Sequence, residues 1–122
     1  MSVAPASSAI LIVDDSPDRA LWTGAFESAG FQAVEAGESG QAFELLRRGP
    51  TIDLLVATLL RDGSGAQLVV DAVQHRPGLA VILIACAGHP VGIQEGCFAL
   101  LLEPVSAAEL LDTAHVLLRR NE

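Results

Sequence analysis

The chain has 122 residues, of which 51% are hydrophobic and 18% are charged. This length fits one domain with a core of its own, and the apolar content excludes an intrinsically disordered protein. A net charge of −8 would repel nucleic acid and anionic membranes, so we expect neither as a partner. All seven basic residues are arginine, which excludes chemistry that needs a lysine ammonium, such as Schiff-base formation.

The N-terminal residues 1–8 are expected to form a disordered or extended tail on a single domain that spans residues 1–122. They lack the basic segment of a secretory signal, and the apolar run that follows is too short to cross a membrane. Cys86 and Cys97 match no zinc motif and are expected to be small buried thiols in a reducing cytosol. We therefore predict a cytoplasmic protein.

Short apolar runs typical of buried strands recur along the chain. The strong runs are residues 9–13, 54–57, 81–84 and 98–102. Continuous runs of this kind indicate strands that are buried on both faces, as in a parallel sheet. Residues 32–36 alternate polar with apolar side chains, which predicts an edge strand.

Segments with a helical spacing of apolar residues separate these strands. The first follows Ser16 and Pro17, the second ends at Arg47-Arg48, the third covers about residues 66–75, and the last opens on a capping box at 106–109. Their predicted inward residues are Leu21, Trp22, Ala25, Phe26 and Ala29; Ala42, Phe43 and Leu46; Leu68, Val69, Ala72 and Val73; and Leu110, Leu111, Ala114, Leu117 and Leu118. The connection 87–96 holds at most one helical turn.

The alternation of strands and helices predicts a doubly wound α/β domain with helices on both faces of a parallel sheet. Five strands favour a flavodoxin-like (βα)5 fold of strand order 2-1-3-4-5, here with its fourth helix shortened or absent. The working site of such a sheet lies at the carboxyl ends of the first and third strands. Asp14 and Asp15 follow the first strand and suggest a divalent-metal site, although capping of the next helix is the alternative.

Residues 10–17 (ILIVDDSP) resemble the opening of a response-regulator receiver domain. Residues 96–105 (GCFALLLEPV) are similar to the family's fifth strand, in which a lysine precedes the proline. Residues 29–31 match the end of its first helix and the start of its second strand, and residues 52–56 match its third strand, so the resemblance covers nearly the whole chain. It implies a signalling module of a bacterial two-component or phosphorelay pathway.

In the family that the chain resembles, an aspartate at the end of the third strand accepts a phosphoryl group from a histidine kinase. Counting forward from Asp53 puts Thr58 at this position, and counting back from Asp62 puts Ala57 there. Neither residue is a carboxylate, and a threonine hydroxyl without an adjacent base is a weak nucleophile. An unconventional acceptor, Asp53 or Asp62, is the alternative within the family.

Three other positions depart from the pattern that the resemblance implies. Ala85 stands at the hydroxyl position, Glu103 at the lysine position and Leu100 at the switch aromatic of the fifth strand. We therefore expect a degenerate receiver, a pseudo-receiver, that lacks phosphoacceptor activity. No nucleophile–base pair is visible, so we do not expect an enzyme.

The acidic pair Asp14 and Asp15 remains as the candidate metal site. A receiver also uses the missing aspartate as a ligand, so we expect Mg²⁺ to bind weakly and no cofactor to be required. Arg61 follows the site in sequence and is a candidate to neutralise Glu103 or Asp14.

The expected mode of action is protein binding, to a histidine kinase or a downstream effector, or to a second copy of the chain. The predicted interface covers the fourth and fifth strands and the last helix, with Leu100, Leu102 and Val105 as candidates. These strands are apolar while the connection between them is short, so another surface is expected to cover them. Collapse of that connection through Val91 and Ile93 is one alternative. A small-ligand sensor that binds a nucleotide in the vacated pocket is another.

Overall fold

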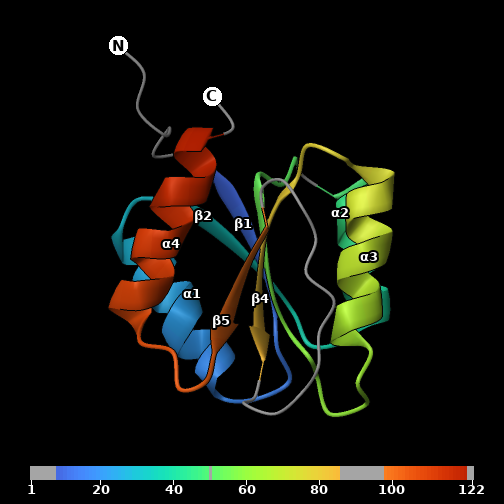
Figure 1. Cartoon of the computed structure of the whole chain (residues 1–122), viewed down its shortest axis with the longest axis horizontal. Helices are drawn as coiled ribbons and strands as arrows, with labels where there is room; N and C mark the ends of the chain where they lie inside the picture. The colour runs from blue at the N-terminus through green and yellow to red at the C-terminus, as the bar shows by residue number, and fades with distance from the viewer. Residues whose placement is uncertain (1–7, 50, 86–97, 121–122) are drawn as a thin grey trace.

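The computed structural model describes residues 8–49, 51–85 and 98–120, which form five strands and four helices. Strands and helices alternate along the chain as far as the fourth strand (Figure 1). The elements are β1 (Ala9–Val13), α1 (Asp18–Ser28), β2 (Gln32–Ala36), α2 (Ser39–Arg48), β3 (Leu54–Thr58), α3 (Gly65–His75), β4 (Ala80–Ala85), β5 (Phe98–Leu102) and α4 (Ala107–Arg120).

The five strands form one parallel sheet of order β2-β1-β3-β4-β5, which confirms the predicted fold class. Val13 at the end of β1 pairs with Ala36 of β2 and with Ala57 of β3, so the carboxyl ends of these strands meet at one edge. β2 lies at one side of the sheet and is partly exposed, as its alternating sequence predicts.

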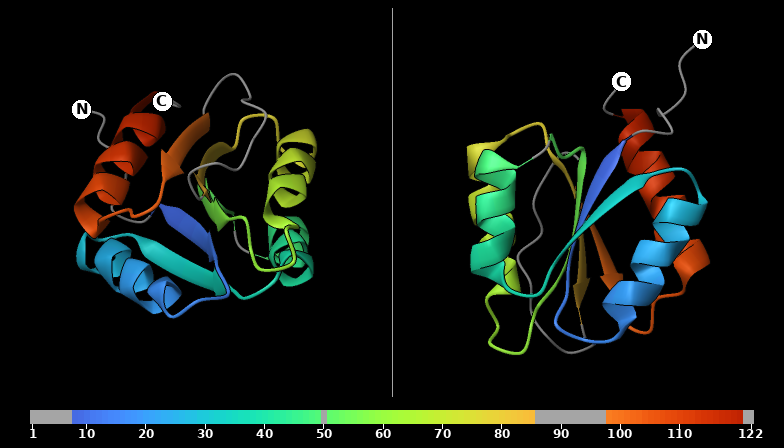
Figure 2. Two further views of the ribbon diagram at one scale, coloured as in Figure 1. Left: turned by 60° about the horizontal axis from the view of Figure 1, so that its bottom comes forward. Right: turned by 180° about the vertical axis from the view of Figure 1, so that it is seen from behind.

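Helices cover both faces of the sheet, with α1 and α4 on one side and α2 and α3 on the other (Figures 1 and 2). Successive side chains of each central strand point to opposite faces of the sheet and pack into two separate hydrophobic cores. In β1, Ile10 and Ile12 join the cluster under α1 and α4, while Leu11 and Val13 join the cluster under α2 and α3. All four are fully buried, which is why the run has no polar position.

Two residues that were expected to face inward from the first helix are exposed. Ala29 is exposed because α1 ends at Ser28, so that Ala29 is its C-cap. Leu21 was expected to face inward, but its exposed fraction is 70%. The buried residues of α1 are Trp22, Thr23 and Phe26. Trp22 and Phe26 stand four residues apart and set the inward direction, and Leu21 is rotated about 100° away from Trp22. The Thr23 hydroxyl is tolerated inside because it donates to the carbonyl of Arg19 (2.8 Å).

Parts of the sequence-based expectations lie outside the described residues. These are the connection 87–96, with Val91 and Ile93, both cysteines, and the tail except for Ser8. Ser8 itself is buried, and its carbonyl accepts a hydrogen bond from the backbone N–H of Gln32 (3.0 Å). None of the helices in the described part of the chain has the length and apolar content needed to cross a membrane.

Candidate functional site

Side chains at the carboxyl ends of β1, β3, β4 and β5 line a hollow of about 250 Å³ at this edge of the sheet. Asp14 and Asp15 follow β1, Thr58 ends β3, and Glu103 follows β5. In Figure 1 this edge lies at the bottom, where the arrowheads of β4 and β5 point. The structure therefore brings together the acidic pair, one of the two candidate acceptor positions and the residue at the lysine position.

Asp14 is buried, with an exposed fraction of 3%, and both of its carboxylate oxygens accept hydrogen bonds from hydroxyl groups. Thr58 Oγ1 donates to Oδ1 (3.1 Å), and Ser16 Oγ donates to Oδ2 (2.6 Å). The Thr58 hydroxyl also lies 3.4 Å from the carbonyl oxygen of Val13. Hydrogen bonds to a charged acceptor are stronger than neutral ones, so these two donors offset much of the cost of burying the carboxylate.

Asp15 is exposed and fixes the loop that follows β3. Its Oδ2 accepts a hydrogen bond from the backbone N–H of Arg61 (2.9 Å). The loop turns sharply because Leu60 and Gly63 have positive φ angles of 64° and 77°. Asp15 therefore holds one wall of the hollow in place.

The structure distinguishes between the two candidate acceptor positions. Ala57 is buried in the core cluster beneath α2 and α3, whereas Thr58 lines the hollow. The two face opposite ways because neighbouring residues of a strand point to opposite faces. Thr58 is thus the β3 residue that faces the acidic pair.

The other positions drawn from the resemblance are also located. Ala85 ends β4 and is buried, and its carbonyl accepts a hydrogen bond from the Glu103 backbone N–H (2.9 Å). The peptide bond between Glu103 and Pro104 is cis. Leu100 is half-buried and packs against the cluster under α2 and α3.

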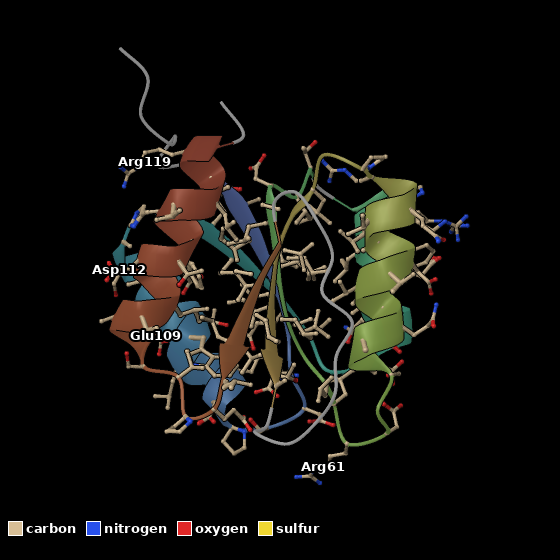
Figure 3. All side chains as sticks on the ribbon, in the orientation of Figure 1. Arg61, Glu109, Asp112 and Arg119 are labelled. Atoms are coloured by element: carbon tan, nitrogen blue, oxygen red, sulfur yellow. The ribbon has the colours of Figure 1, made fainter. Side chains whose placement is uncertain are left out.

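The expectation for Arg61 is wrong. Its side chain is exposed and points out into solvent (Figure 3). No salt bridge between described residues joins it to Asp14 or Glu103. Its contact with the site runs through the backbone N–H instead.

Arg19 is a cation next to the site that the sequence patterns did not reveal. Its Nη1 donates to the backbone carbonyl of Asp14 (2.9 Å), and its Nε pairs with Glu35 of β2 (2.7 Å). The signal was its position five residues after Asp14, in the first turn of α1, where a long side chain reaches back over the strand ends. Arg19 therefore ties the end of β1 to the edge strand.

Asp53 and Asp62, the alternative acceptors, lie elsewhere. Asp53 precedes β3 at the amino edge of the sheet, where its Oδ2 accepts a hydrogen bond from the Ala9 backbone N–H (2.9 Å). Asp62 is exposed in the loop before α3, and its Oδ1 accepts from the Ser64 side chain (2.7 Å) and backbone (3.0 Å). These hydrogen bonds lower the pKa of Asp62, the side-chain bond most.

A second, larger hollow of about 740 Å³ lies between α1 and the loop that joins β5 to α4. Leu21, Trp22 and Val105 contribute apolar walls, and Asp18 and Glu103 contribute charge. Val105 packs on the α1 and α4 side of the sheet, whereas Leu100 packs on the opposite side. The three predicted interface residues Leu100, Leu102 and Val105 therefore do not form one patch, and Leu102 is the exposed one, at 51%.

Comparisons with known proteins place the chain among proteins of the receiver fold. Over 117 aligned positions it is 31% identical to a "Probable cyclic di-GMP phosphodiesterase" of Vibrio cholerae serotype O1. That alignment covers 87% of the chain and 25% of the relative, so the chain spans about a quarter of that protein's length. No protein-family model matches the chain.

Three solved structures agree closely in fold. A receiver protein from Sinorhizobium medicae has a TM-score of 0.82 and 23% identity, covering 95% of this chain and 98% of that one. A CheY-like receiver domain from Methanospirillum hungatei has a TM-score of 0.82 and 22% identity, covering 94% and 96%. A receiver domain from Clostridium thermocellum has a TM-score of 0.81 and 22% identity, covering 93% and 95%. The chain thus has the flavodoxin-like fold of receiver domains.

Proposed function

We propose that the chain is a receiver-like module of a bacterial two-component or phosphorelay pathway that accepts no phosphoryl group. It acts by binding another protein and has no catalytic activity of its own. The observation that carries this proposal is the Thr58 hydroxyl at the end of β3, which is hydrogen-bonded to Asp14. The resemblance implies that a receiver has its acceptor carboxylate at this end of the strand.

The chemistry of the hollow supports the absence of phosphoryl transfer. The Thr58 hydroxyl donates to Asp14, but a threonine that accepted a phosphoryl group would carry a stable ester rather than the labile acyl phosphate of a receiver. No lysine exists in the chain to hold the phosphoryl oxygens, and Glu103 adds negative charge where a receiver has that lysine. A dianionic phosphoryl group would therefore meet repulsion.

The test is incubation with acetyl phosphate and Mg²⁺, followed by intact-mass measurement before and after acid treatment. We expect no mass gain. A gain of one acid-labile phosphoryl group would contradict the proposal, and its loss in Asp53→Asn or Asp62→Asn would identify the unconventional acceptor. Asp53 accepts a hydrogen bond from the Ala9 backbone N–H at the opposite edge of the sheet, which makes it an unsuitable acceptor.

The proposed partner is a signalling protein, either a histidine kinase or a downstream effector, or a second copy of the chain. Leu102, the exposed residue at the end of the edge strand β5, is the candidate contact residue. The module requires no cofactor in this proposal, and weak Mg²⁺ binding at this acidic edge does not depend on the buried Asp14 carboxylate.

A further inference from the structure

We infer that hydroxyl groups occupy the place of a divalent cation at Asp14, so that the site keeps its shape without metal. Thr58 is the residue that closes the site to cations. The inference deepens the proposed function and rests on it for one point, the identification of Thr58 with the acceptor position. It concerns the interactions that stabilise the site, whereas the proposed function concerns phosphoryl transfer.

The donor set of the hollow does not fit a magnesium ion. Mg²⁺ requires close to octahedral coordination by oxygens, with carboxylates as its protein ligands. Both carboxylate oxygens of Asp14 are engaged by the hydroxyls of Thr58 and Ser16. One oxygen of Asp15 is engaged by the backbone N–H of Arg61. A cation would have to displace these donors before it could bind.

Two further observations agree with a site that is complete without metal. No buried side-chain oxygen or nitrogen among the described residues lacks a hydrogen-bond partner, so none is left for a cation to satisfy. No group of three or more His, Cys, Asp or Glu side chains in the described ranges is arranged to hold a metal ion. Glu103 lines the same hollow but does not complete such a group.

Thr58 determines whether the site needs a cation, because its hydroxyl faces the Asp14 carboxylate at 3.1 Å. An aspartate at this position would place two carboxylates against each other in a largely buried setting. Like charges so close repel strongly, and a shared divalent cation would relieve the repulsion. The substitution Thr58→Asp should therefore make the stability of the fold depend on the cation.

The experiment measures the thermal unfolding midpoint in EDTA and in 10 mM MgCl₂, with NaCl added to equal ionic strength. The matched salt is needed because screening alone stabilises a chain of net charge −8. Trp22 is the only tryptophan in a chain without tyrosine, so its fluorescence reports unfolding. We expect the wild type to shift by less than about 1 °C, and Thr58→Asp to rise by about 5 °C or more with Mg²⁺.

Thr58→Asn is the matched control, because it has the size of aspartate without the charge and should show no response to Mg²⁺. The double variant Thr58→Asp, Asp14→Asn should lose the response of Thr58→Asp. A folded Thr58→Asp without a response to Mg²⁺ would overturn the inference.

Binding of Mn²⁺ to the wild type and to Asp14→Asn, measured by electron paramagnetic resonance, provides a second test that needs no new carboxylate. We expect equal, weak binding by both proteins. Tighter binding by the wild type would overturn the inference even if Thr58→Asp failed to fold. That result would leave the proposed function standing unless phosphoryl transfer also appeared in the mass measurement.

Discussion

At the scale of single residues, the hydroxyl of Thr58 supports a buried charge. Replacing Thr58 by valine keeps the shape but removes one donor from the Asp14 carboxylate. Leaving a buried charged group short of a hydrogen bond costs about 1–3 kcal/mol, so we expect a loss of stability of that size in urea unfolding. Thr113→Val is the control, because that hydroxyl only bonds to the Glu109 carbonyl of its own helix. Equal losses in the two variants would contradict the role of Thr58.

A second prediction at this scale concerns Asp62 and the pH dependence that it adds. The Ser64 side chain and backbone N–H hold the pKa of Asp62 below its usual value. A carboxyl group whose pKa is lowered by folding stabilises the fold above its unfolded pKa, and this contribution is lost as pH falls through the folded pKa. Ser64→Ala should raise the pKa of Asp62, as followed by NMR titration. An unchanged pKa would show that the hydroxyl is not the main cause.

At the scale of elements, the start of α3 presses directly against the end of β3. A Cβ added at Gly65 would lie 1.8 Å from the carbonyl oxygen of Thr58. That oxygen belongs to the backbone, so it cannot move aside as the end of a side chain could. We expect Gly65→Ala to destabilise the fold by about 2 kcal/mol or more and to disturb the hollow. Gly24→Ala in α1 is the control, because nothing lies within 4 Å of its added Cβ, and it should stabilise by about 0.5–1 kcal/mol. A neutral Gly65→Ala would indicate that the helix can move away from the strand.

The elements themselves could be predicted well because they depend on local patterns. β1 and β5 have the predicted bounds, because each strand begins and ends with a continuous run of apolar residues. The site could be predicted less well because its contacts join distant residues. The hydrogen bond between Thr58 and Asp14 spans 44 positions, and no count along the chain could choose Thr58 over Ala57. The alternation of side chains along β3 turns Thr58, and not Ala57, toward the acidic pair.

The prediction for Arg61 was wrong for the same reason, because contacts between residues far apart in the sequence are hard to predict. Arg61 was expected there because it follows the site in sequence, but sequence order carries no information on the direction in which a side chain leaves a loop. Arg19 reaches the site because the first turn of a helix after β1 directs its side chain back across the strand ends. Periodicity identified the inward face of α1, although it did not separate Leu21 from Trp22.

At the scale of the whole molecule, the two faces of the sheet are covered by pairs of helices, and β5 is left as an edge strand. An edge strand presents unpaired backbone groups that can accept a partner strand. Leu102 adds a large apolar side chain, 51% exposed, at the end of this edge. The edge beside Leu102 is therefore where we expect the proposed partner, a signalling protein or a second copy, to bind.

The substitution Leu102→Glu tests this surface, with Val116→Glu on α4 as its control, since the two side chains are equally exposed, at 51% and 52%. Leu100 is less suitable because it packs against the core, and its loss would confuse stability with binding. If self-association uses this edge, light scattering after size exclusion should show a dissociation constant at least tenfold higher for Leu102→Glu, as for an apolar contact residue worth about 1.4 kcal/mol or more. Higher salt should strengthen the wild-type association, because it screens the repulsion between two chains of charge −8. The same weakening by Val116→Glu, with both proteins folded, would show that added charge rather than this edge controls the association.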